Sequence, residues 1–139
     1  MQLSKEHQLA LQWFRDRAGE VLRWPEPLEG LFLVNRAKGI HKPEGWEHAL
    51  SVRLSMTSPY QDEITENPSR GWKLTYAYEG TSPTHFTNRA LRKCMVDGVP
   101  VGVLVQVEGR PQSRYRVLGV GLVEEDDAVA CKFKIASID

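Results

Sequence analysis

The feature that most constrains the fold is a series of short segments after residue 27 that are rich in apolar residues, in some of which apolar residues alternate with polar ones. Alternation with a period of two predicts half-buried β-strands, and the glycines, prolines and acidic residues between the segments predict turns. The predicted strands cover residues 31–35, 49–55, 72–80, 100–108, 114–124 and 128–137. Residues 58–71 contain two prolines and several turn-forming residues, and they are predicted to be a loop.

Two segments have helical spacing instead. A helix capped by Ser4 is predicted to run to about Leu22, because Leu9, Trp13, Phe14 and Val21 recur near one helical face. The segment Trp24-Pro25-Glu26-Pro27 would end this helix. A shorter helix is predicted over 88–96, with Asp97 and Gly98 as its stop. The chain is therefore predicted to be an α+β domain built on a small curled sheet or barrel.

Length and composition fit one globular unit. The 139 residues suffice for a single core, and we expect a helical brace over 1–26 joined to the main domain over 27–139. No apolar run approaches the about 20 residues of a membrane span, and the N-terminus lacks the apolar stretch of a signal peptide, so a cytoplasmic protein is expected. Cys94 and Cys131 are too few for a disulfide framework and are expected to be core thiols.

The net charge of zero hides an uneven distribution. Residues 36–116 carry more basic than acidic side chains, whereas both ends of the chain carry more acidic ones. Ordinary surface scatter would explain this pattern on its own. Phosphate binding, however, needs local rather than global positive charge.

Catalytic patterns are missing. The sequence has no GxSxG, HExxH, Walker, GxGxxG or CxxC motif, and His41 and His48 are too far apart for a metal pair on one helical face. We therefore expect a binding domain with no catalytic residue, no metal and no cofactor. The acidic pair Asp62 and Glu63 leaves open a small metal-dependent nuclease as a minor alternative.

A series of short motifs in a fixed order resembles the SET- and RING-associated (SRA) family of modified-cytosine-binding domains, which have a PUA-like fold. The motifs extend from residue 39 to residue 119. They are Gly39-Ile40-His41, the strand ALSVRLS, Tyr60-Gln61-Asp62-Glu63, Tyr76-Ala77-Tyr78-Glu79-Gly80, Asn88-Arg89-Ala90-Leu91 with Cys94, Gly98-Val99-Pro100-Val101 and Tyr115-Arg116-Val117-Leu118-Gly119. The N-terminal helix is more similar to versions of the domain attached to bacterial HNH-type restriction endonucleases.

The resemblance implies a pocket for a cytosine flipped out of double-stranded DNA. Extrusion costs a few kcal/mol, which stacking and hydrogen bonds in a pocket must offset. The matching aromatic positions are Tyr60 and Tyr78, although amphipathic core packing is an alternative for both, and a stronger one for Tyr78.

A carboxylate in the family accepts a hydrogen bond from the exocyclic amine of cytosine. Here the spacing from Tyr60 indicates Glu63, whereas side-chain type indicates Asp62, and a solvated loop charge is the alternative for both. Glu79, which follows the second tyrosine, is a further candidate for the base edge.

The resemblance also places the wall that tests the 5-position at Ser55, Met56, Thr57 and Ser58, where the family tends to have glycines and this chain is about two residues longer. Candidates for contacts with the DNA backbone, or for a wedge that fills the gap left by the base, share positions in the basic middle of the chain. They are Arg36, Ala37, Lys38, His41, Lys42, His85, Phe86 and Arg89.

Taken together, the sequence predicts a reader of 5-methylcytosine or 5-hydroxymethylcytosine, with a nuclease domain as a linked or separate partner. The alternative is a related small barrel that binds RNA or a protein, in which both tyrosines would belong to the core.

Overall fold

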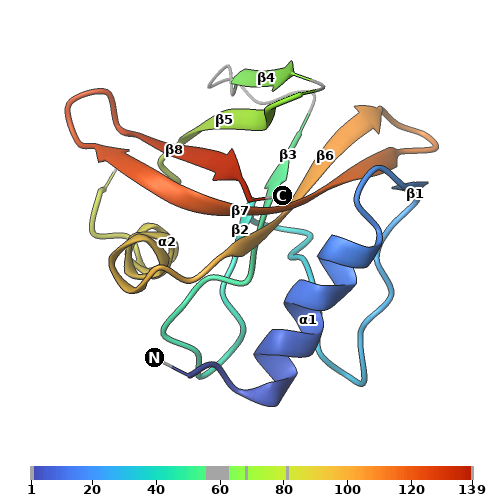
Figure 1. Cartoon of the computed structure of the whole chain (residues 1–139), viewed down its shortest axis with the longest axis horizontal. Helices are drawn as coiled ribbons and strands as arrows, with labels where there is room; N and C mark the ends of the chain where they lie inside the picture. Colours follow the sequence, from blue (N-terminus) through green and yellow to red (C-terminus); the bar gives the residue numbers. More distant parts are fainter. Residues whose placement is uncertain (1, 56–62, 68, 81, 139) are drawn as a thin grey trace.

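The computed structural model describes residues 2–55, 63–67, 69–80 and 82–138, which form two helices and eight strands (Figure 1). The helices are α1 (Lys5–Asp16) and α2 (Phe86–Asp97). The strands are β1 (Val21–Leu22), β2 (Ile40–His41), β3 (Ser51–Leu54), β4 (Glu63–Asn67), β5 (Gly71–Ala77), β6 (Val101–Glu108), β7 (Arg114–Asp127) and β8 (Lys132–Ser137).

All eight strands belong to one sheet, which confirms the predicted α+β fold with a curled sheet. The order is β2-β3-β6-β7-β8-β5-β4, and β1 pairs with β7 off this path. Strands β3 and β6 pair in parallel, whereas every other neighbouring pair in this order, and the pair β1 and β7, is antiparallel. The register shifts within the long strand β7, at Val123/Glu125 opposite β8, and irregularities of this kind bend and twist a sheet.

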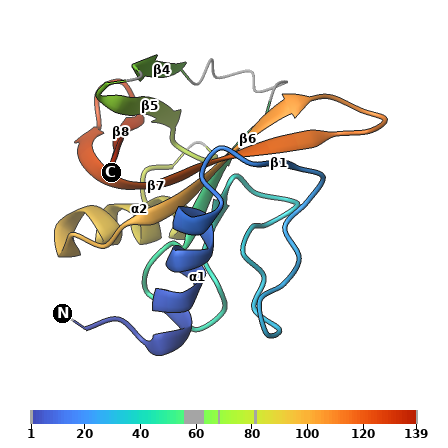
Figure 2. The same cartoon turned by 45° about the vertical axis from the view of Figure 1, so that its right-hand side comes forward.

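The curled sheet has a core on each face. Adjacent residues of β6 belong to different cores. Val103 packs inside the curl with α2, in what we call the inner core, whereas Leu104 packs outside the curl with α1. Figure 2 shows α1 against β6 and β7 on the side opposite β4 and β5. Its Phe14 ring lies so close to Gly102 that a Cβ there would be 2.3 Å from a ring carbon. A side chain at this glycine would therefore push the helix off the sheet.

Helix α2 matches its predicted position and extends slightly beyond it at both ends. His85 caps its first turn and Gly98 ends it with a φ of 67°, in the left-handed region that glycine favours. By contrast, α1 ends at Asp16 rather than near Leu22, and Val21 and Leu22 pair with β7 instead. The predicted helical face is also wrong at Leu9, which is exposed, because the buried face consists of His7, Ala10, Leu11 and Phe14.

The predicted strand at 31–35 is absent; this segment is described, and it is irregular. The turn before it has positive φ angles at Glu29 and Gly30, which leads into a bridge between Leu28 and Leu31 rather than a ladder. Its carbonyl groups accept hydrogen bonds from side chains: the Ser51 hydroxyl donates to the Leu33 oxygen, and His41 to the Phe32 oxygen. Side chains thus take the place of a neighbouring strand.

Two other boundaries differ from the predictions. Residues 63–67, expected to be loop, form β4 and pair with β5, with Ile64 packed against the inner core. The acidic run Glu124–Asp127, expected to be a turn, continues β7, and the chain turns after it. Within the described residues, no helix is long and apolar enough to cross a membrane.

The two cysteines differ in their surroundings. Cys94 is a core thiol as predicted, because α2 buries it completely against the inner core. The same prediction is wrong for Cys131, which is exposed. It lies in the turn between β7 and β8 with a φ of 56°, so the chain reverses there before the side chain reaches the core.

Candidate nucleic-acid interface

Most residues of the predicted base pocket lie between Ser55 and Glu63, outside the residues that the structure describes. Met56, Thr57, Ser58, Tyr60 and Asp62 all fall there. At the edges of this segment, Ser55 is half-buried and its hydroxyl donates to Gln106 Oε1 at 3.2 Å, and the Glu63 backbone begins β4 opposite Thr75. The roles assigned to the residues of this segment therefore stay predictions.

The structure places Tyr78 in the inner core. Its side chain is 5% exposed, and its ring centroid lies 4.9 Å from that of Phe133. The Tyr78 hydroxyl donates to Asp126 Oδ1, and Arg92 Nε donates to Asp126 Oδ2 at 2.5 Å. Burial, followed by the hydrogen bond to Asp126, raises the pKa of Tyr78 above its ordinary value. Tyr78 thus packs in the core in this structure, and its role in stacking on a flipped base stays a prediction.

Glu79, which follows Tyr78 in the sequence, links the end of β5 to the segment before β2 by a hydrogen bond. Its Oε2 accepts a hydrogen bond from the Gly39 backbone N–H at 2.8 Å. Asn88 fixes the Glu79 backbone from α2, because its Oδ1 accepts from Glu79 N and its Nδ2 donates to Glu79 O, both at 2.8 Å. The second carboxylate oxygen, Oε1, is buried without a hydrogen-bond partner among the described residues. Buried acceptors are normally satisfied, so this oxygen is suited to a donor on a ligand.

Several predicted contact residues gather beside Glu79. The Asn35 side chain accepts hydrogen bonds from Ala37 N at 2.8 Å and Lys38 N at 3.0 Å, which shapes a tight turn there. Lys38 Nζ lies 4.1 Å from the ring centroid of Phe86, and the His85 ring stacks on the same Phe86 at 4.9 Å. The structure therefore brings Lys38 to the consecutive residues His85 and Phe86, which lie far from it in the sequence.

The remaining predicted contacts are placed differently. Arg36 and Ala37 are exposed in the turn, Arg89 is exposed on α2, and Lys42 is half-buried after β2. His41 is buried, and burial lowers its pKa, so its ring is neutral near pH 7 rather than a cation for a phosphate.

A groove of about 1030 Å³ lies next to this cluster and contains four arginines. They come from four separate segments, namely Arg23 after β1, Arg36 before β2, Arg53 on β3 and Arg110 in the β6–β7 turn. The lining includes no aspartate or glutamate, and in the described part of the chain no carboxylate pairs with any of the four.

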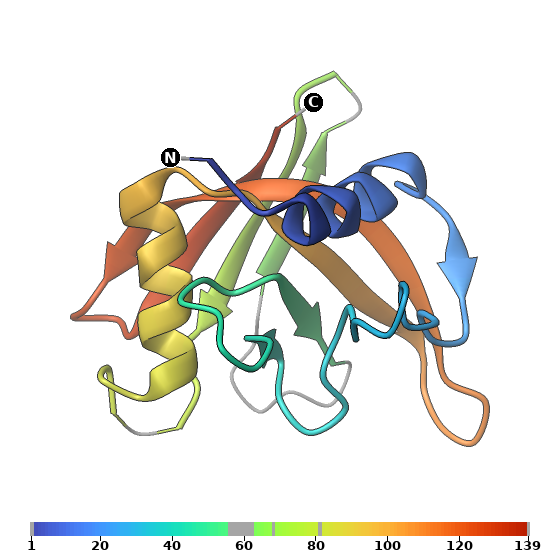
Figure 3. The ribbon, with the colours of Figure 1, turned by 90° about the horizontal axis from the view of Figure 1, so that it is seen from below.

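The groove is partly preorganised. Arg53 donates to the Asn35 oxygen at 3.2 Å and to the Arg36 oxygen at 3.3 Å, so this guanidinium is held in place without being neutralised. Figure 3 shows the β6–β7 turn, the segment before β2 and the segment before α2 projecting toward the same edge of the molecule. Sequence reasoning missed Arg23, Arg53 and Arg110. The excess of basic residues over 36–116 was the only signal for Arg53 and Arg110, and Arg23 lies outside that region and had none.

Ser55 also lines this groove, so the groove reaches the point where the predicted base-pocket loop begins. An unpaired row of guanidinium groups at such a place can bind phosphates bidentately. Within the described residues, no group of three or more histidine, cysteine, aspartate or glutamate side chains is arranged to hold a metal ion.

Comparisons with known proteins agree on the fold. No family model and no curated protein sequence matches this chain. Among solved structures, the SUVH5 SRA domain in complex with fully methylated CG DNA matches over 88% of each chain, at 21% identity and a TM-score of 0.58. The SUVH5 SRA complex with methylated CHH DNA matches over 87% of this chain and 93% of that one, at 23% identity and a TM-score of 0.54.

KRYPTONITE in complex with mCHH DNA, an H3(1-15) peptide and SAH matches over 99% of this chain, at 15% identity and a TM-score of 0.59. This chain spans only 38% of the KRYPTONITE chain. Identities this low establish the architecture and no more. The sheet, the two helices and the groove described above are therefore those of a chain with the SRA fold.

Proposed function

We propose that this chain binds double-stranded DNA and recognises a 5-modified cytosine, either 5-methylcytosine or 5-hydroxymethylcytosine, by flipping it out of the duplex. The observation that carries the proposal is the groove of four arginines without carboxylate partners among the described residues, which ends at the predicted base-pocket loop. Solved SUVH5 SRA domains of the same fold are complexes with methylated DNA, which supports this choice of ligand.

The charge of the groove suits a DNA backbone better than a protein surface. Each phosphate that an arginine contacts releases condensed counterions, so binding weakens as salt rises. Such contacts fix position but carry no sequence information. The choice of base therefore has to come from the neighbouring pocket, where one acceptor and stacking surfaces are needed.

Glu79 supplies an acceptor in the described part of the chain. Its buried, unpartnered Oε1 could accept a hydrogen bond from the exocyclic amine of cytosine, a donor that thymine and uracil lack. Asp62 and Glu63 remain the other two candidates for this role. Substitution of each of the three in turn distinguishes them, because only the true acceptor sets the preference for a base that carries an amine.

We further propose that the chain is the sensor of a modification-dependent restriction endonuclease whose cutting activity lies in another domain. The support is the resemblance of the N-terminal helix to versions of the domain attached to HNH-type endonucleases. Incubation of the chain with modified DNA and Mg²⁺ or Mn²⁺ tests this division of labour. Cleavage by the chain alone would overturn it and favour the metal-dependent nuclease instead.

The direct test of the binding proposal is a panel of otherwise identical duplexes. The target base is cytosine, 5-methylcytosine, 5-hydroxymethylcytosine or glucosylated 5-hydroxymethylcytosine, and the dissociation constant is measured for each. We expect tighter binding to the methyl or hydroxymethyl duplex than to the cytosine duplex. Equal affinity for all four, or tighter binding of an RNA of the same sequence, would contradict it.

A further inference from the structure

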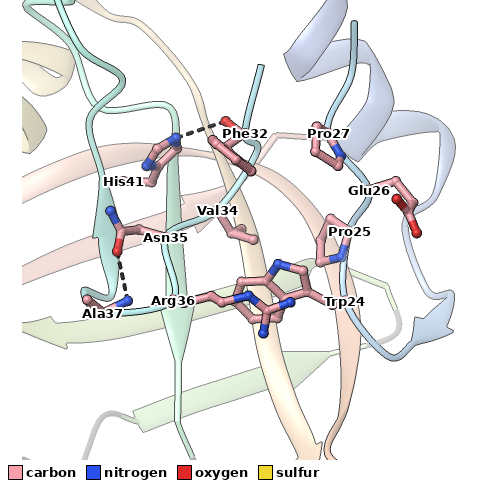
Figure 4. Close-up of a pocket in the computed structure, with 10 residues that line it drawn as sticks. All are labelled: Trp24, Pro25, Glu26, Pro27, Phe32, Val34, Asn35, Arg36, Ala37 and His41. Carbon is pink, nitrogen blue, oxygen red and sulfur yellow. Dashed lines mark hydrogen bonds between the residues drawn. The ribbon is translucent and has the colours of Figure 1, made fainter. Parts of the chain in front are cut away.

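A second hollow, lined by none of the residues assigned to the predicted base pocket, adjoins the arginine groove. It has a volume of about 530 Å³ and lies between the segment after β1 and the segment before β2. Figure 4 shows Phe32 at one end, the Trp24 and Arg36 pair at the other, and Val34 between them. A pocket of this size has ample room for one nucleobase.

The walls of this hollow offer flat surfaces for stacking. Phe32 is 64% exposed, which is unusual for a side chain of its size beside other apolar residues. The Arg36 guanidinium lies 4.4 Å from the centroid of the Trp24 ring, and Trp24 itself packs edge-on against Tyr115. A guanidinium plane held on an indole is a good surface for a nucleobase, since both aromatic rings and arginine planes stack on unpaired bases.

Besides the charged side chains of Glu26 and Arg36, the same hollow has a neutral histidine. His41 lines it, and its Nε2 lies 2.8 Å from the Phe32 carbonyl oxygen, to which it must donate. The neutral ring then carries its hydrogen on Nε2, so that Nδ1 is an acceptor, and Nδ1 has no partner among the described residues. A hollow lined mainly by apolar and aromatic side chains, with a neutral histidine and the carboxylate of Glu26, suits a base better than it suits a phosphate or a carboxylate.

The hollow and the arginine groove are continuous, because Trp24 and Arg36 line both. A base in the hollow would therefore have its own phosphate beside Arg36 and near Arg23 or Arg53, which line the groove. An aromatic slot next to a row of unneutralised cations is the arrangement by which proteins hold unstacked nucleotides.

We propose that the hollow formed by Trp24, Phe32, Arg36 and His41 binds a second unstacked nucleobase of the bound DNA, in addition to the modified cytosine. This rests on the proposed function in that the chain must bind DNA. It does not depend on which base occupies the pocket predicted at Tyr60 and Tyr78. The second base would lie on the same DNA, with its phosphate in the arginine groove.

The test combines photochemical crosslinking with one pair of variants. Duplexes carry 5-iododeoxyuridine at single positions around a 5-methylcytosine, and crosslinked peptides are identified by mass spectrometry. One iododeoxyuridine position should crosslink to Trp24 or Phe32. Phe32→Ala should abolish the Phe32 crosslink and weaken DNA binding roughly tenfold, as loss of one stacked base does. Val129→Ala, which removes another exposed apolar side chain in the β7–β8 turn, should change neither.

The outcomes separate this inference from the proposed function. If 5-methylcytosine is preferred but Phe32→Ala binds as the wild type does and no crosslink reaches Trp24 or Phe32, the second site is refuted and the proposed function stands. If a Phe32 crosslink forms but methylated and unmethylated duplexes bind equally, the proposed function is refuted and the second site stands. A chain that binds no DNA at all refutes both.

Discussion

The charged side chains of the arginine groove, beside the β6–β7 turn, differ from those at the β7–β8 end in whether they have partners of opposite charge. At the groove, Arg23, Arg36, Arg53 and Arg110 have no carboxylate partner in the described part of the chain. At the β7–β8 end the acidic residues are already engaged: Asp126 with Arg92 and Tyr78, Glu125 with Lys134, and Asp127 with two backbone N–H groups. The contrast indicates that the second set of charges stabilises the fold, whereas the first set is available to a ligand.

The largest effect is expected on the free energy of unfolding, when the contacts of Asp126 at the β7–β8 end are removed. Asp126→Ala leaves the partly buried Arg92 guanidinium and the Tyr78 hydroxyl without their shared acceptor, so the free energy of unfolding should fall by about 2–3 kcal/mol. Urea denaturation measures this loss. Glu124→Gln, at an exposed residue on the same strand, should change the free energy of unfolding by less than about 0.5 kcal/mol. Equal losses in both variants would show that the Asp126 contacts are not structural.

The next effect concerns the groove itself. Replacement of Arg23 and Arg110 by glutamine should weaken DNA binding roughly tenfold near 0.1 M salt and lower the slope of log K against log salt by about two, one for each lost phosphate contact. The unfolding free energy should hardly change, since both side chains are exposed.

The matched control for that experiment removes two positive charges from the other end. Lys132→Gln with Lys134→Gln gives the same net charge, but Lys134 is paired with Glu125. Its salt slope should equal that of the wild type. Identical slopes for the two double variants would mean that DNA responds to net charge alone, and the contrast between the two ends would be lost.

The smallest effect concerns Glu79 and the choice of base. Glutamine keeps an oxygen for the Gly39 N–H, but its amide can donate to the O4 oxygen of thymine, so discrimination between the two bases should relax. We expect Glu79→Gln to lower the preference for 5-methylcytosine over thymine, each opposite guanine, by about fivefold. Competition binding measures this ratio. If the ratio changes only in Asp62→Asn or Glu63→Gln, that residue is the acceptor instead.

The sequence was a good guide to elements whose pattern is repeated and local. The apolar run over 100–108 and the apolar spacing over 88–96 predicted β6 and α2, because the run reflects a strand with cores on both faces and the spacing reflects one buried helical face. The prediction failed where another part of the chain decides the conformation. At 31–35 the side chains of Ser51 and His41 take up carbonyl groups, and at 63–67 a largely polar strand forms because β5 offers its edge.

The same limit applies to the candidate site. Residue type and motif order singled out Lys38, Phe86 and Glu79. The structure places Lys38 over the Phe86 ring, and the Glu79 carboxylate accepts a hydrogen bond from the Gly39 N–H. The arginine groove had no such local signal. Strand pairing brings its members together: β3 pairs in parallel with β6, which places Arg53 near the strand that leads to Arg110, and β1 pairs with β7, which brings Arg23 to the same groove.

The measurement that tests the central claim most directly is a salt titration of DNA binding with two duplexes that differ only in one 5-methyl group on one cytosine. Phosphate contacts in the groove set the slope of log K against log salt, whereas recognition of the methylated base adds a nearly salt-independent term. The account predicts two parallel lines, with the methylated duplex bound more tightly at every salt concentration. Lines that coincide would contradict it.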